Sequence, residues 1–237
     1  MQERRTVVIH QPDFLPYPGF FHRLLHCDDF VVLDHVQLLR RGWHHRDQVK
    51  APHGVVWFTV PIVNIHHIQS IRDARIDHGH DWIRKQLNRI ASYYREAPCF
   101  GTVFPVLERI LQRGHDRLLD LNMELLAWFL DYFGIRVKMH LSSGWDVQER
   151  RNEMNIELVR KVGGKVYLSG SGARAYLDES LFRQAGIEVA WQQYRCRPYP
   201  QLHGAFVPNL SCLDFAMNCG SRLRDYVEDD GVAGDPL

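Results

Sequence analysis

The sequence has little excess charge of either sign and no long hydrophobic run. Its 29 Lys and Arg residues nearly balance 28 Asp and Glu residues, which leaves a net charge of +1. General attraction to DNA or to an anionic membrane is therefore not expected. No apolar run reaches the roughly 18–20 residues that span a bilayer, and the opening MQERRTVVIHQPD lacks the pattern of a secretory signal. These absences predict a cytoplasmic protein with neither DNA nor a membrane as a partner.

Several signatures of known catalytic and metal sites are missing as well. The five cysteines form no Cys-x-x-Cys pair, which argues against a zinc ribbon and against a disulfide framework. There is no Walker sequence and no Gly-x-Ser-x-Gly elbow. Of the clustered histidines, His78 and His80 beside Asp77 and Asp81 come nearest to a ligand set, but they sit in a glycine-containing loop. No metal site is predicted.

Apolar segments and helical patterns alternate along much of the chain. Five segments are predicted to be strands, at about 6–10, 29–34, 136–141, 165–169 and 187–193. A helical pattern follows the first of them, and strand–helix–strand units of this kind join parallel strands. The sequence predicts an α/β fold with a five-stranded, mostly parallel, doubly wound sheet of the Rossmann-like or HUP-like type.

A largely helical insertion at about 64–134 is expected to interrupt this single domain of residues 1–237. Its helices are predicted at 81–95, about 102–113 and 118–133. Two strands are predicted at 55–63, just before the insertion, and at 68–77, and they are expected to form a hairpin or an edge. The apolar helix Met123–Phe133 suggests a homodimer interface. A closing segment at about 195–237 is expected to hold one helix and to end in a frayed acidic tail.

The loop HQPDFLPYPG, directly after the first strand, is the leading candidate for a catalytic site. Ligands of doubly wound sheets bind beyond the carboxyl ends of the strands, where the strand order reverses. His10 is the side chain whose ordinary pKa suits proton transfer near neutral pH, and three prolines stiffen the loop. His10, Gln11 and, after the second strand, Asp34 are the predicted catalytic residues. The alternative is that His10 ends a buried strand and hydrogen-bonds a carbonyl.

Two further segments supply candidate substrate-binding residues at the same rim. LDHVQLLRRGWHHRDQVK places cations around a tryptophan, which suits a phosphate, a carboxylate or a pantetheine-like arm. YLSGSGARAYLD puts small residues after a strand, where backbone amides can cradle an anion. The candidates are Gln37, Arg40, Trp43, Arg46, Lys50, Ser169, Ser171, Arg174 and Tyr176. A solvated charged loop and an ordinary glycine-rich turn are the alternatives.

The opening loop is similar in outline to that of the nucleotidylyltransferase and class I synthetase superfamily. Phe14, Pro16 and Gly19 have the corresponding spacing. The His-x-Gly-His element of that superfamily is absent, however, because Phe20 follows Gly19 and only His10 or His22 could substitute. This departure counts against nucleotidyl or adenylyl transfer, with ATP or CTP and Mg²⁺, which is kept as an alternative.

Over almost its full length the sequence resembles the WbqC-like family of bacterial proteins. The matching motifs are IHQPDFLPYPGFF, DDFVVLDHVQ, WHHRDQVK, FTVPI, YLSGSGARAYLD and YPQLHGAFVPNLSCLDFAMNCG. His45 and Asp47 depart from the pattern, because many members have asparagines around that arginine. The resemblance implies a biosynthetic protein associated with O-antigen and other surface sugars, or with specialised metabolites.

Together these patterns favour a small-group transferase that moves an acyl or aminoacyl group to an amine of a sugar or amino-acid precursor. His10 is expected to act as the base, Gln11 and Gln37 to orient the acceptor, and Asp34 to hold an ammonium or hydroxyl group. Arg46, Lys50 and Arg174 are expected to bind the donor. No cofactor is firmly implied; an acyl thioester and ATP with Mg²⁺ are the two candidates, and a carrier protein or tRNA is a candidate donor. A non-catalytic ligand-binding scaffold in a biosynthetic complex is a third hypothesis.

Overall fold

The computed structural model describes residues 4–227 and 232–234, and its centre is a parallel sheet. Five parallel strands form it: β1 (Thr6–His10), β2 (Asp29–Val32), β5 (Lys138–Leu141), β6 (Val166–Ser169) and β7 (Glu188–Gln192). Their order is β5-β2-β1-β6-β7. The predicted α/β, doubly wound, Rossmann-like fold is confirmed, with each strand ending within two residues of its predicted bounds.

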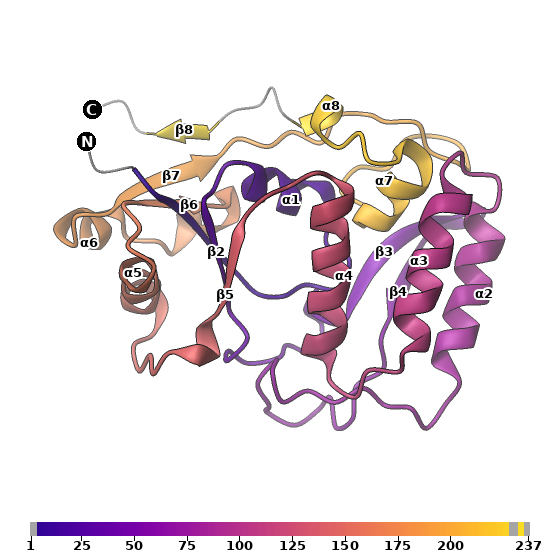
Figure 1. Ribbon diagram of the computed structural model, residues 1–237, viewed down its shortest axis with the longest axis horizontal. Coiled ribbons are helices and arrows are strands. Elements are labelled where there is room, and N and C mark those ends of the chain that lie inside the picture. Colours follow the sequence, from indigo (N-terminus) through magenta and orange to yellow (C-terminus); the bar gives the residue numbers. More distant parts are fainter. Residues whose placement is uncertain (1–3, 228–231, 235–237) are drawn as a thin grey trace.

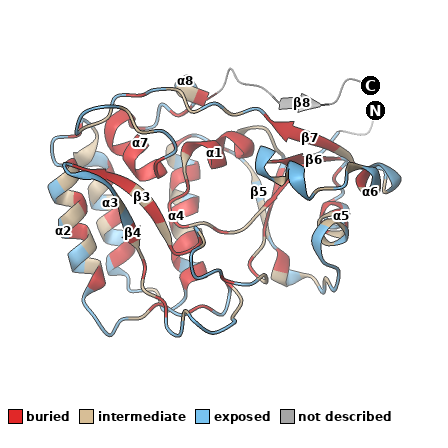
Figure 2. Ribbon diagram, turned by 180° about the vertical axis from the view of Figure 1, so that it is seen from behind, coloured by how far each residue is buried: buried red, intermediate tan, exposed pale blue. Residues whose placement is uncertain are grey.

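Alternating side chains of the strands face two separate cores, which is why helices cover both faces of the sheet. Val7, Ile9 and Val31 face one core, against α5 (Arg151–Lys161) and α6 (Glu179–Gln184). Val8 and Phe30 face the other, against α1 (Pro18–Leu25), α4 (Leu118–Tyr132) and α7 (Cys212–Cys219). Burying each such side chain contributes about 1.5–3 kcal/mol. Figure 2 shows that much of α1, α4 and α7 is buried, drawn in red.

The insertion lies on the opposite side of the molecule from α5 and α6 (Figure 1). The predicted helices are present as α2 (Trp82–Tyr94), α3 (Phe100–Gln112) and α4. Gly134, in the left-handed region with φ of 65°, follows the end of α4. The apolar side chains of α4, including Phe129 at 0% exposure, pack into the chain's own core. A homodimer through this helix stays a prediction.

The predicted strand at 68–77 is wrong. These residues form turns with isolated bridges, such as the one between Ile62 and Ile76. The partner of β4 (Gly54–Thr59) is instead β3 (Arg46–Ala51), a segment for which no strand was predicted. The polar side chains of β3 obscured the strand in the sequence, because the buried positions include Asp47 and Lys50, and the Lys50 ammonium is bound by Gly204 in a part of the chain distant in sequence.

Beyond β7 the chain returns across the second core through α7 and a short α8 (Arg224–Val227), which was not predicted. Part of the tail expected to fray forms β8 (Val232–Gly234), antiparallel to β7. The rest of that tail, residues 228–231 and 235–237, lies outside the described residues. Short 3₁₀ turns, η1 (Ser142–Gly144) and η2 (Ser171–Ala175), follow β5 and β6.

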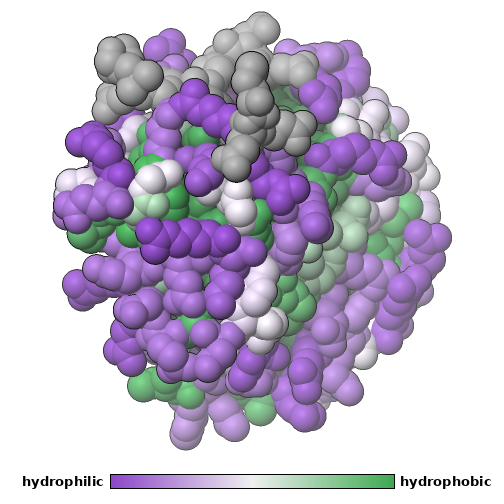
Figure 3. All heavy atoms as spheres, turned by 60° about the vertical axis from the view of Figure 1, so that its left-hand side comes forward, coloured by the Kyte–Doolittle hydropathy of each residue, from purple (hydrophilic) through white to green (hydrophobic). Residues whose placement is uncertain are grey.

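The outer surface around α5 and α6 is mostly hydrophilic, with apolar side chains visible between the charged ones (Figure 3). All five cysteines are free thiols. None of the helices within the described ranges is both long and apolar enough to cross a membrane.

Candidate functional site

A cavity of about 630 Å³ opens at the carboxyl ends of β1, β6 and β7. From β1 the sheet runs one way through β2 and β5, and from β6 it runs the other way. The cavity therefore lies at the switch point of the sheet, where doubly wound folds bind their ligands. Its lining comes from the opening loop, the loop before β3, the turn after β6, and the segment after β7.

The opening loop is fixed by hydrogen bonds from distant parts of the chain. The Asn122 amide of α4 donates to the carbonyls of Pro12 and His44, both at 2.7 Å. The Ser211 hydroxyl, at the start of α7, donates to the Leu15 carbonyl at 2.7 Å. Leu15 has a φ of 49°, an unfavourable conformation for a leucine that costs on the order of 1–3 kcal/mol. The surrounding structure thus holds this loop in one shape.

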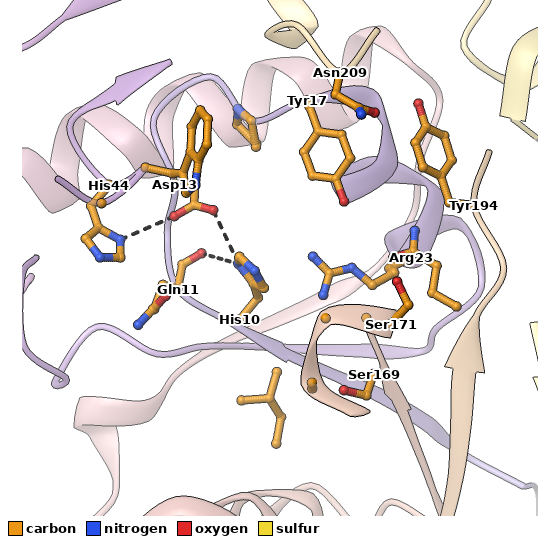
Figure 4. Close-up of a pocket in the computed structure, with 18 of the residues that line it drawn as sticks. His10, Gln11, Asp13, Tyr17, Arg23, His44, Ser169, Ser171, Tyr194 and Asn209 are labelled. Atoms are coloured by element: carbon orange, nitrogen blue, oxygen red, sulfur yellow. Dashed lines mark hydrogen bonds and ion pairs between the residues drawn. The ribbon is translucent and has the colours of Figure 1, made fainter. Parts of the chain in front are cut away.

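His10 lies in the cavity with one ring nitrogen already engaged (Figure 4). Nδ1 is 3.0 Å from the Gln11 carbonyl oxygen, which only accepts, so the neutral ring carries its proton on Nδ1. Nε2 then holds the lone pair of a base. The pKa of His10 is lowered to about 4, mainly by burial and secondly by the positive charge of Arg23. His10 is consequently neutral at physiological pH.

Asp13 stands behind His10 and joins it to a second histidine. Its carboxylate oxygens lie 3.6 Å from Nδ1 of His10 and 3.3 Å from Nδ1 of His44. A carboxylate at this distance stabilises an imidazolium formed when the ring accepts a proton. Asp13 and His44 were not predicted as site residues, although they belong to the two segments HQPDFLPYPG and LDHVQLLRRGWHHRDQVK, which supplied other predicted site residues.

Arg23 of α1 is the least expected residue of the cavity. Only 6% of its surface is exposed, and its guanidinium points toward the cavity centre (Figure 4). The sequence contained a signal, because Arg23 follows Phe20 by three residues and so shares the buried side of the helix. A Cβ at Gly170 would lie 3.2 Å from Nη1. The glycine after β6 therefore gives the guanidinium its room.

Aromatic rings wall the cavity beside the start of α1. Tyr17 and Tyr194 meet edge to face with ring centroids 5.8 Å apart. A Cβ at Gly19 would approach Tyr17 Cε2 to 2.3 Å and Tyr194 Cδ1 to 2.7 Å. Only a glycine at position 19 leaves room for these two rings.

Asp47 on β3 also lines the cavity and was not predicted as a site residue. It is 3% exposed, and burial raises the pKa of its carboxyl to about 8. At neutral pH Asp47 is protonated and able to donate a hydrogen bond.

The structure brings half of the predicted residues to this cavity. His10, Gln11, Trp43, Ser169, Ser171 and Tyr176 line it. The remaining six, Asp34, Gln37, Arg40, Arg46, Lys50 and Arg174, lie elsewhere. Their predicted roles remain predictions, but none of these six side chains lines the cavity.

Asp34 and Lys50 are buried and hydrogen-bonded within the protein. Asp34 accepts from the Ser142 hydroxyl at 2.9 Å and from the Ser143 amide at 2.8 Å, which ties the end of β2 to that of β5. The Lys50 ammonium donates to the carbonyls of Gly204 at 3.1 Å and Ala205 at 2.6 Å. It thereby joins β3 to the closing segment.

The other four residues lie toward the surface. The Arg46 guanidinium packs over Trp57 at 4.2 Å, and Arg174 packs over Trp191 at 4.4 Å. Gln37 and Arg40 are exposed.

Comparison with known proteins agrees with the motifs. The model of the WbqC-like protein family matches residues 11–226, and the chain belongs to this family. A protein of Mycobacterium tuberculosis (strain ATCC 25618 / H37Rv), named "Uncharacterized protein Rv1507c", is 32% identical over 226 residues, covering 94% of this chain and 97% of that protein. No solved structure matches the chain.

Proposed function

We propose that this protein is a small-group transferase that moves an acyl or aminoacyl group to an amine of a sugar or amino-acid precursor. The observation that supports it most is His10, a neutral imidazole with Nδ1 engaged and Nε2 available, inside the cavity at the switch point. General base catalysis needs this combination of a fixed ring and a free lone pair.

In the proposed reaction the amine nitrogen attacks the carbonyl carbon of an activated donor. As the new C–N bond forms, the nitrogen becomes acidic, and Nε2 of His10 accepts its proton. The Asp13 carboxylate, 3.6 Å from Nδ1, stabilises the resulting imidazolium. The bond from the carbonyl carbon to the leaving group then breaks, and His10 returns the proton to that group. The neutral carboxyl of Asp47 is available as a further hydrogen-bond donor to a ligand.

Nucleotidyl transfer is the second candidate, because a buried arginine and aromatic rings also suit a nucleotide phosphate. Against it, His22, one of the two histidines that could replace the superfamily's pair, is fully buried beneath Gln192 and does not line the cavity.

A ligand panel separates the candidates. Purified protein is heated with acyl-CoAs, acyl carrier protein thioesters, aminoacyl-tRNA, nucleotide amino sugars, and ATP or CTP with Mg²⁺. A ligand at about 100 times its dissociation constant stabilises the fold by about 2.7 kcal/mol. Stabilisation by a thioester or aminoacyl donor, followed by transfer to an amine, is expected. Stabilisation by a nucleoside triphosphate with release of pyrophosphate would replace this proposal with nucleotidyl transfer. Ligand binding without turnover would support the scaffold hypothesis.

A further inference from the structure

Arg23 carries a buried positive charge that nothing in the described chain neutralises. It is 6% exposed, and its Nε has no hydrogen-bond partner. Within residues 4–227 and 232–234, no carboxylate forms an ion pair with it and no carbonyl accepts from its terminal nitrogens. The guanidinium carbon lies 5.8 Å from the centroid of the Phe20 ring, which is a cation–π contact. Burying an unpaired charge costs several kcal/mol, and an anion bound from outside the chain would offset this cost.

The surroundings of the guanidinium are shaped to leave space in front of it. Gly170 supplies no side chain where a Cβ would crowd Nη1. Ser169 and Ser171, on either side of that glycine, bring two hydroxyl groups to the same cavity. In Figure 4 the guanidinium points into the open space between His10, Tyr17 and these serines.

We propose that Arg23 binds an oxyanion of the substrate, a phosphate or a carboxylate, inside this cavity. The planar guanidinium can donate two parallel hydrogen bonds to either group. The inference rests on the proposed function for placing that substrate beside His10, and it names the substrate class: a molecule with an anionic group close to its reacting centre.

Anion binding also has a consequence for His10. The positive charge of Arg23 lowers the pKa of His10, Asp13 raises it, and His44 lowers it. An anion that pairs with Arg23 removes part of the lowering and makes Nε2 a stronger base when substrate is present.

The test measures binding without turnover. Calorimetric titrations with inorganic phosphate, pyrophosphate and acetate, at matched ionic strength in chloride, are made on the wild type, Arg23→Met and Arg109→Met. Arg109 is an exposed residue of α3 outside the cavity, so its variant controls for the loss of one charge. We expect Arg23→Met to bind the preferred anion at least tenfold more weakly, and Arg109→Met to bind as the wild type does. A preference for phosphate or for acetate identifies the anionic group.

Two controls keep the outcome interpretable. Arg23→Met should melt at the same or a higher temperature than the wild type in anion-free buffer, because it removes an uncompensated charge. His10→Ala should still bind the anion, so failure of the catalytic proposal leaves this result intact. Absence of anion binding to the wild type, unchanged binding to Arg23→Met, or a lower melting temperature of Arg23→Met with anion binding retained would each overturn the inference.

Discussion

At the scale of single residues, the account depends on the protonation state of His10. Its ring would titrate near 6.5 in an unfolded chain, whereas burial and Arg23 lower the pKa to about 4 in the fold. Protonation therefore favours the unfolded chain, and the stabilising contribution of the neutral ring is lost as the pH falls from about 6.5 through 4.

An NMR titration of the imidazole Cε1 proton checks this directly. We expect a midpoint near 4 for His10 in the wild type and a higher midpoint in Arg23→Met, where the nearby positive charge is gone. His10→Gln, which has no such signal, assigns the resonance. A midpoint near 6.5 in the wild type would contradict a base held neutral by its surroundings.

Residues of the site differ in how far the sequence reveals them. His10 and Gln11 could be predicted because they directly follow a strand whose pattern is clear. For Arg23 the spacing from Phe20 indicates only the buried side of the helix, and its place in the cavity depends on Gly170, which lies far away in sequence. Lys50 was predicted to bind substrate because it follows a run of cations, but contacts with Gly204 and Ala205 decide where its ammonium lies.

At the scale of elements, the start of α1 connects fold and site. Gly19 lets Tyr17 and Tyr194 lie against the helix, and any larger residue would displace these two rings of the cavity wall. The second residue of the helix must therefore be a glycine for the cavity to keep its shape.

Gly19→Ala should weaken ligand binding by about tenfold or more and destabilise the protein by about 1–3 kcal/mol, as overpacking does. Gly101→Ala in α3 is the matched control, since a Cβ there meets nothing within 4 Å. It should leave binding unchanged and stabilise by up to about 1 kcal/mol. Chemical denaturation of both variants measures the free energy of unfolding, and ligand titration measures the dissociation constant. Equal binding by both variants would show that the two rings do not shape the site.

The elements themselves were predictable where burial follows from local pattern. Val7, Val8 and Ile9 form an unbroken apolar run, as expected of a strand covered on both faces. β3 failed this criterion because its buried positions include Asp47 and Lys50. Residues 68–77 resembled a strand by composition, yet in the described part of the chain they form only isolated bridges and no ladder with a strand.

At the scale of the whole molecule, a buried network around Asp214 joins the insertion to the sheet domain. The Asp214 carboxylate accepts from the hydroxyls of Tyr94 at 2.6 Å and Tyr199 at 2.8 Å, and from the Gln201 amide at 3.1 Å. These residues come from α7, α2 and the closing segment. Burial raises the pKa of Asp214, and the hydrogen bonds from the tyrosines oppose this.

Asp214→Ala should destabilise the protein by about 3–5 kcal/mol, because it leaves several buried donors without an acceptor. Tyr94→Phe removes one of those hydrogen bonds and should cost about 1–2 kcal/mol. Urea unfolding followed by tryptophan fluorescence and by far-UV circular dichroism measures both. A loss below 1 kcal/mol for Asp214→Ala would show that this network does not hold the parts together.

The central claim is that His10, in the cavity at the switch point of the sheet, is the base of a group transfer. The most direct test is turnover of the wild type and His10→Ala with the donor that the ligand panel identifies. We expect kcat to fall by about 10²–10⁴-fold in His10→Ala, with donor binding and melting temperature little changed. Turnover of His10→Ala at the wild-type rate would contradict the account.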